Sequence, residues 1–228
     1  MNEQKKTPDE RNQKPKKFIS KHSKTILIVV LALVFAGGFL LWKKVIKDYV
    51  IPRNFGVVED GLIYRSGRIS ARLIKNTLIE YNIRVIIDLT DDKLNDADQD
   101  AEKKAANDLN IERILIPLRG NGTGDVNSYA YAIETIVEAK KKNEPVLVHC
   151  AGGTQRTGGV IAAYRLLVEQ KDPSFVLKEL KQYGWYTRDK DLVIYLNENM
   201  AKLAGLLEQK HIIERVPAII PQLGSGEK

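Results

Sequence analysis

Apolar and polar positions divide the chain into one uninterrupted hydrophobic run near its start and a long remainder of shorter runs. Residues 26–42 read ILIVVLALVFAGGFLLW without a charge, and Thr25 extends the run. About 20 residues span a bilayer as a helix, with a lower limit of about 17. A helix buried in a globular domain would show one polar face, and this run shows none. The pattern predicts a transmembrane signal anchor over residues 25–42, between a basic, disordered tail over 1–24 and a linker over 43–52.

The basic residues around this run predict its orientation. Eight lysines and arginines precede the run, and four follow it closely. The positive-inside rule then places the N-terminus in the cytoplasm and the rest of the chain outside, in the periplasm or at the cell surface. Because four basic residues also follow the run, a domain on the cytoplasmic side stays an alternative. A cleaved signal peptide is the competing interpretation, but its apolar region usually has only about 7–15 residues.

Beyond the linker, short apolar runs alternate with patterns of helical spacing. The predicted strands are residues 83–89, 111–116 and 145–149, and the predicted helices are residues 69–81, 98–109, 157–170, 173–183 and 189–210, together with a helix capped by Asp125. Strands that alternate with helices predict an α/β domain, here over residues 53–210, with a mainly parallel central sheet flanked by helices. Residues 211–228 contain two prolines and a GSG sequence and are predicted to be a flexible tail.

Charge and composition exclude several classes of function. The formal net charge is +7, but residues 1–48 hold the whole excess and residues 49–228 are neutral. A nucleic-acid-binding domain would normally be basic itself, so we expect no nucleic-acid partner. The single cysteine excludes an intrachain disulfide and a multi-cysteine zinc site. Because the three histidines are scattered, we predict no metal and no cofactor.

The one cysteine stands at the end of a predicted strand. Residues 145–159 read PVLVHCAGGTQRTGG, so the strand ends at Cys150 and a glycine-rich loop leads to Arg156 and a helix start. Successive backbone N–H groups and a helix N-terminus then surround one point, which is a site for an oxyanion such as phosphate. Arg156 can grip two phosphate oxygens with its planar guanidinium. The same positive surroundings favour the thiolate form of Cys150, which is a nucleophile.

The residues H-C-x-x-G-x-x-R-T, from His149 to Thr157, resemble the signature of the cysteine-dependent protein tyrosine phosphatase superfamily. Two segments before it, residues 54–58 (NFGVV) and 61–67 (GLIYRSG), look like the N-terminal part of compact dual-specificity-like phosphatases of the atypical and bacterial group. The resemblance covers about residues 53–200 and implies a dual-specificity-phosphatase-like fold.

The resemblance also implies roles for the signature residues. Cys150 would attack phosphorus and form a cysteinyl-phosphate. Thr157 would donate to the sulfur and help it leave, and His149 would tune the thiol without acting as a base. The expected phosphate-binding residues are Ala151, Gly152, Gly153, Thr154, Gln155 and Arg156. We call residues 150–156 the signature loop.

The resemblance further implies a general acid on a separate loop. Asp125 ends the glycine-rich stretch RGNGTGD before a predicted helix and matches this position. A simple helix N-cap would also explain an aspartate there. Asp88, at the end of a predicted buried strand, is the rival acid and is more typical of a structural residue.

The variable positions of the signature loop bear on the substrate. Ala151, Gly152, Thr154 and Gln155 are all neutral, which favours a simple phosphomonoester such as phosphotyrosine over a polyanionic lipid or inositol head. Phosphoserine and phosphothreonine stay open. We therefore expect a membrane-anchored phosphatase with a phosphorylated protein substrate. The alternatives are a phosphatase of phosphoinositides or inositol phosphates, a phosphate-binding module without turnover, and a single-cysteine sulfurtransferase.

Overall fold

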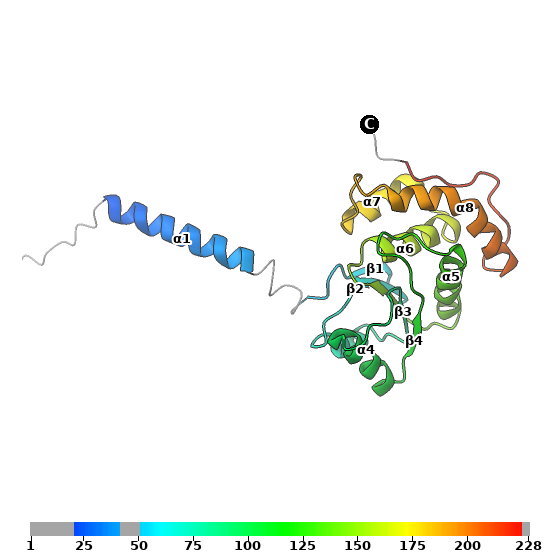
Figure 1. The fold of residues 1–228 in the computed structure, drawn as a ribbon, viewed down its shortest axis with the longest axis horizontal. Helices are drawn as coiled ribbons and strands as arrows, with labels where there is room; N and C mark the ends of the chain where they lie inside the picture. The colour runs from blue at the N-terminus through cyan, green and yellow to red at the C-terminus, as the bar shows by residue number, and fades with distance from the viewer. Residues whose placement is uncertain (1–20, 42–50, 225–228) are drawn as a thin grey trace, which may run out of the picture. The chain divides into compact units, whose positions relative to one another are not determined.

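The computed structural model describes residues 21–41 and 51–224 (Figure 1). The chain divides into two compact units, Met1–Lys44 and Val45–Lys228. Most of the predicted basic tail and linker falls on residues 1–20 and 42–50, which lie outside the described residues.

The first unit contains helix α1 (Lys21–Leu41), which covers most of the hydrophobic run. Its described large apolar side chains are exposed, as Leu33 and Phe35 illustrate. Over residues 21–41 and 51–224, no helix combines the length and the apolar character that crossing a membrane requires. The transmembrane helix predicted over residues 25–42 is thus not found among the described residues.

The second unit is built on a five-stranded sheet with the order β1-β2-β5-β3-β4. The strands are β1 (Gly56–Glu59), β2 (Ile63–Gly67), β3 (Val85–Asp88), β4 (Glu112–Leu115) and β5 (Val146–Cys150). Only β1 and β2 pair antiparallel, and the pairs β2–β5, β5–β3 and β3–β4 are parallel. The prediction of a mainly parallel α/β sheet is confirmed.

Helices cover both faces of this sheet (Figure 1). One face packs against α3 (Ile74–Glu80) and α4 (Ala97–Asp108), and the other against α5 (Val126–Lys141) and α6 (Gln155–Leu167). Helix α8 (Asp191–Gln209) packs on α5 and α6, and α7 (Pro173–Gln182) lies beside α6. Side chains alternate between the two faces of a strand. In β5, Val146 and Val148 join the α5–α6 core, while Leu147 joins the α3–α4 core.

Aspartates begin three of these helices. The side chains of Asp96, Asp125 and Asp172 each accept a hydrogen bond from a backbone N–H in the first turn of α4, α5 or α7. Such caps satisfy donors that have no partner within the helix. The predicted helix over 69–81 begins only at Ile74.

The segment after α8 differs from the flexible tail predicted over residues 211–228. Asn197 of α8 both donates to the carbonyl of Leu223 and accepts from its N–H, at 2.9 and 2.8 Å. Leu223 is only 2% exposed. Because paired amides and an apolar anchor hold this segment, residues 211–224 pack on the domain, and residues 225–228 lie outside the described residues.

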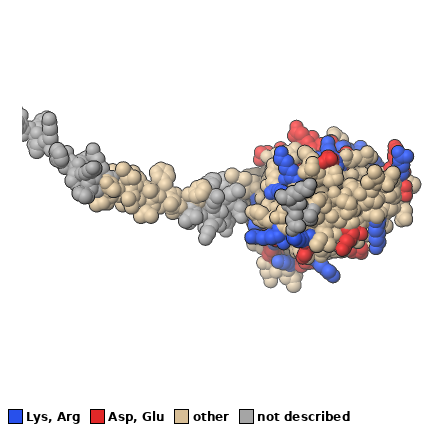
Figure 2. Space-filling model, turned by 90° about the horizontal axis from the view of Figure 1, so that it is seen from above, with Lys and Arg blue, Asp and Glu red and all other residues tan. Residues whose placement is uncertain are grey.

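Acidic and basic side chains are interspersed on the face of the second unit that Figure 2 shows. This agrees with the equal numbers of both signs in residues 49–228.

Candidate active site

The signature loop connects the central strand β5 to α6. All of β5 is buried, and it lies between β2 and β3, so its last residue Cys150 emerges at the carboxyl edge of the sheet. Gly153 has a left-handed backbone, with φ of 73°, and a Cβ there would lie 2.5 Å from Gly67 N. The loop can therefore run this close to the end of β2 only with glycine at this position.

The surroundings of Cys150 favour its thiolate. The thiol is 2% exposed, and the N–H of Gly153 donates to Sγ at 3.2 Å. Burial alone would raise the pKa of Cys150, but hydrogen bonds from the Thr157 side chain and backbone, the charge of Arg156 and the Gly153 N–H together lower it. Thr157 is fully buried, and its hydroxyl lies a long 3.4 Å from Ser66 O, which leaves the sulfur as its better partner.

Arg156 has unused hydrogen-bond donors. Its Nη1 makes only a long contact of 3.5 Å with Leu89 O, and among the described residues its buried Nε has no hydrogen-bond partner. A buried donor without a partner is costly, and a bound oxyanion would remove that cost. The phosphate-binding role expected for Arg156 stays a prediction.

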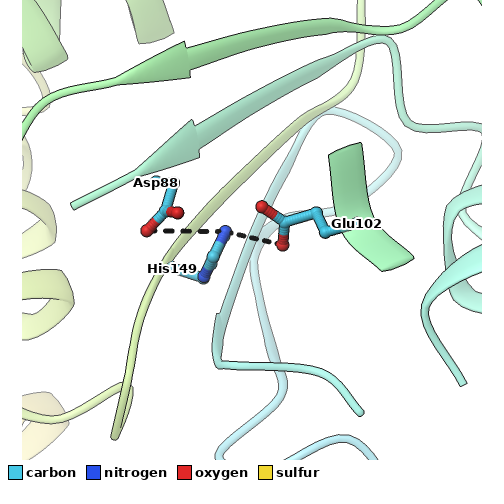
Figure 3. A group of neighbouring side chains, drawn as sticks. All are labelled: Asp88, Glu102 and His149. Carbon is cyan, nitrogen blue, oxygen red and sulfur yellow. Dashed lines mark ion pairs between the residues drawn. The ribbon is translucent and has the colours of Figure 1, made fainter. Parts of the chain in front are cut away.

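His149 lies on the opposite face of β5 from Cys150, within a buried group of charges (Figure 3). Its Nε2 is 3.0 Å from Glu102 Oε2 and 4.0 Å from Asp88 Oδ1. Arg113 on β4 contacts both carboxylates, with Nε 2.8 Å from Glu102 Oε1 and Nη2 beside Asp88 Oδ2. Burial would lower the pKa of His149, but Glu102 and Asp88 raise it to about 9.

The same three side chains could be spaced for a metal ion. Asp88, Glu102 and His149 each offer one ligand atom within 4.8 Å of the others. However, Arg113 already occupies an oxygen of both carboxylates. The same carboxylates raise the pKa of His149, which favours the protonated imidazole over one with a lone pair for a metal. Two anions and two cations balance within the group, so its charges favour an ion-pair network over a metal site.

Asp125 begins α5, as the sequence predicts. Its exposed carboxylate accepts from the backbone and the side chain of Asn127, both at 2.9 Å, and these hydrogen bonds lower its pKa. The glycine-rich stretch before it approaches the signature loop, because a Cβ on Gly122 would lie 3.1 Å from Gln155 O. The structure thus shows the N-cap directly and brings the neighbouring loop to the site, while the role of Asp125 as acid stays a prediction.

Two residues that the sequence analysis named only as part of the family resemblance contact the signature loop. Asn54 donates to Gly152 O, and Arg65 on β2 donates to Gly153 O. Glu102 and Arg113 were missed altogether, since their sequence positions show only an ordinary helix and an ordinary strand. Asp88 serves the ion-pair network, which favours the structural interpretation of this rival acid.

Comparison with known proteins identifies the domain. Residues 65–184 match the family model "Dual specificity phosphatase, catalytic domain". Vaccinia virus (strain Copenhagen) dual specificity protein phosphatase OPG106 is 29% identical over 154 residues, which cover 62% of this chain and 82% of that protein. Variola virus dual specificity protein phosphatase H1 is 28% identical over the same length and shares of coverage.

Solved structures share the fold. The crystal structure of P. aeruginosa TpbA has a TM-score of 0.54 at 22% identity and covers 68% of this chain and 88% of its own. The core catalytic domain of the PP-IP phosphatase Siw14 from S. cerevisiae has a TM-score of 0.56 at 18% identity and covers 72% of this chain and 96% of its own. At these identities the structures support the architecture, and the chemistry is argued from the site itself.

Proposed function

Because the chain belongs to the dual specificity phosphatase family and is a protein phosphatase, we propose that it hydrolyses phosphotyrosine monoesters through a cysteinyl-phosphate on Cys150. The observation that carries this proposal is the environment of Cys150: a buried thiol that accepts from Gly153 N–H, next to an arginine with unused donors. A packing cysteine would need neither feature.

In the first step, the Cys150 thiolate attacks phosphorus, the S–P bond forms and the bond from phosphorus to the ester oxygen breaks. Backbone N–H groups of the signature loop and the Arg156 guanidinium would bind the three non-bridging oxygens as charge spreads over them. In the second step, water attacks phosphorus, the new O–P bond forms as the S–P bond breaks, and the thiolate leaves. The proton that the water loses would pass to the carboxylate left after the general acid has protonated the ester oxygen. Thr157, whose hydrogen bonds lower the pKa of Cys150, would stabilise that leaving thiolate.

The leaving oxygen of the first step needs a proton, and Asp125 is the proposed donor. The support is its position after a loop whose Gly122 adjoins Gln155. Because its pKa is lowered, the Asp125 carboxyl is ionised in most molecules of the free protein at neutral pH. The proposal therefore requires that a bound phosphate dianion raises the pKa of Asp125 by like-charge repulsion.

The neutral residues at the variable positions of the signature loop, Ala151, Gly152, Thr154 and Gln155, support a phosphotyrosine substrate over a polyanionic one. The viral relatives are dual specificity phosphatases by name, so phosphoserine and phosphothreonine belong in the test. The experiment compares kcat/KM for matched phosphotyrosine, phosphoserine and phosphothreonine peptides and for a soluble phosphoinositide head group. The phosphotyrosine peptide is expected to be fastest, and a faster head group would overturn the proposed substrate class.

We also propose, from the sequence alone, that the phosphatase domain lies outside the cytoplasmic membrane. The uncharged run over residues 26–42 and the eight basic residues before it support this location. A reporter fused after Lys228 tests it, together with cell fractionation. Activity of a cytoplasmic-only reporter would overturn the orientation, and recovery of the chain apart from membranes would overturn the anchor.

A further inference from the structure

Asn54 holds the signature loop from a segment almost one hundred residues earlier in the chain. Its side-chain amide donates to Gly152 O at 2.8 Å and lies 3.3 Å from Thr154 Oγ1. The Asn54 backbone is left-handed, with φ of 47°, a conformation that asparagine tolerates better than most residues. This backbone aims the amide at the loop, and the side chain thereby fixes one loop carbonyl and one loop hydroxyl.

Arg65 holds the next carbonyl of the loop from inside the sheet. It is 1% exposed in the middle of β2, and its Nη2 donates to Gly153 O at 2.8 Å. Its guanidinium carbon lies 3.8 Å from the ring centroid of Tyr183. Burying a cation costs free energy unless other interactions offset the loss of hydration, so Arg65 needs compensating contacts. The hydrogen bond to the signature loop and the stacking on the Tyr183 ring are such contacts.

Tyr183 completes this arrangement. Its backbone carbonyl accepts from Thr154 Oγ1 at 2.9 Å, and its hydroxyl fills the space where a Cβ of Gly56 would stand. Gly56 therefore has no room for a side chain, because Tyr183 occupies that space. The two segments that resemble the family outside the signature thus meet at the signature loop.

These contacts have one consequence for the loop backbone. In a trans peptide unit, the C=O bond and the N–H bond of the following residue point in opposite directions. When a side chain outside the loop holds a carbonyl outward, the following N–H therefore points into the loop, where it can bind an anion. Asn54 and Arg65 draw out the carbonyls of Gly152 and Gly153, and the following N–H groups belong to Gly153 and Thr154. The Gly153 N–H indeed donates to the sulfur of Cys150.

We infer that Asn54 and Arg65 are positioning residues that hold the signature loop in its anion-binding form by fixing its outward carbonyls. The inference rests on the proposed function, because it assigns a purpose to the loop geometry that phosphoester hydrolysis needs. It adds that a preformed loop, held from outside the signature, sets both phosphate affinity and the thiolate form of Cys150.

Asn54→Gly tests the first contact in the 228-residue chain, because glycine keeps the left-handed backbone and removes only the amide. Asn143→Gly is the matched control, since Asn143 is also left-handed, with φ of 57°, but precedes the opposite end of β5. We expect Asn54→Gly to weaken inorganic phosphate binding by about tenfold, because two hydrogen bonds to the loop are lost. The control should bind phosphate like the original chain.

Arg65→Lys tests the second contact, with Arg165→Lys as control. Arg165 is likewise a buried arginine whose Nη2 donates to a backbone carbonyl, that of Val58 at 2.9 Å, away from the signature loop. Lysine keeps the charge in both variants and loses the forked donor. We expect Arg65→Lys to raise the pKa of Cys150 and weaken phosphate binding, and Arg165→Lys to change only thermal stability.

The thiolate titration, read from ultraviolet absorbance against Cys150→Ser, separates this inference from the proposed function. It reports the loop even in a chain that turns nothing over. An unchanged Cys150 pKa and unchanged phosphate affinity in both Asn54→Gly and Arg65→Lys would overturn the inference. A chain with a low Cys150 pKa that depends on Asn54 but has no esterase activity would instead overturn the proposed function.

Discussion

His149 Nε2 lies 3.0 Å from Glu102 Oε2, and the residue that follows His149 is Cys150. Because neighbouring side chains on a strand point to opposite faces, the imidazole faces α4 while the thiol faces α6. A charged imidazole, with its pKa raised to about 9, therefore stands behind the nucleophile. Burial would raise the pKa of Glu102, but His149 and Arg113 lower it to about 2. The resulting carboxylate keeps the imidazole of His149 charged.

Replacing Glu102 by glutamine should lower the pKa of His149 towards its ordinary value and raise that of Cys150. Removing one partner from a buried ion-pair network should also cost about 3 kcal/mol of unfolding free energy. Imidazole titration by NMR and chemical denaturation measure the two effects. Glu112→Gln, at an exposed position of β4, is the control and should stay within about 0.5 kcal/mol of the original chain. An unshifted His149 titration in Glu102→Gln would contradict this account.

The raised pKa of His149 also predicts how stability depends on pH. The folded state holds the proton more tightly than the unfolded state, whose ordinary value is 6.5. The extra stability is therefore complete below pH 6.5 and is lost as the pH rises through about 9. Comparing unfolding free energies of Cys150→Ser and of Cys150→Ser with His149→Gln over this range isolates the effect, since the thiol coupled to His149 is absent from both. A constant difference across the range would show that His149 is not charged in the folded state.

Asp125→Asn should separate the two roles of this residue. Asparagine caps a helix about as well as aspartate, so stability should change little. If Asp125 is the acid, kcat for an alkyl phosphate should fall by about 10²-fold or more, because a poor leaving group needs the proton. Asp172→Asn, at the equivalent cap of α7, is the matched control and should keep full activity. Equal activity of both variants at every pH would assign Asp125 to capping alone.

Thr157→Val should affect the second chemical step most. Valine keeps the shape of the fully buried Thr157 and removes the hydroxyl that stabilises the Cys150 thiolate. The phosphoenzyme should then be hydrolysed more slowly than it forms and accumulate. Rapid-quench experiments should show a burst of product followed by steady turnover reduced by about 10–10²-fold, the size expected for one charge-assisted hydrogen bond. A variant without a burst and with unchanged turnover would remove Thr157 from the reaction.

Local signals account for what the sequence predicted correctly. The signature loop is contiguous from Cys150 to Arg156, so its strand, glycines and helix start can be read together. Asp125 shows the residue type of an N-cap directly before a helical pattern, and the structure places it there. The apolar runs that became β3 and β5 are β-branched and buried, which is the pattern of central parallel strands.

Nonlocal pairings explain what the sequence missed. Strand β2 is fully buried, yet it contains Arg65 and Ser66, and a buried arginine breaks the apolar pattern that predicts a strand. The buried arginine is explained by its hydrogen bond to Gly153, which lies 88 positions later in the chain. Glu102 and Arg113 meet His149 only after α4 and β4 dock on β3 and β5. The predicted helix over 69–81 started too early, because Ile69 enters the same core as Ile74 from the irregular segment before α3.

The most direct test follows hydrolysis of p-nitrophenyl phosphate by the 228-residue chain in the presence of a chelator, beside Cys150→Ser. Serine keeps the shape of the loop and replaces the thiolate by a hydroxyl that is not ionised at neutral pH. We predict turnover by the original chain, unaffected by the chelator, and none by the variant, which should still bind phosphate. Turnover that persists in Cys150→Ser, or that the chelator abolishes, would contradict a cysteinyl-phosphate mechanism.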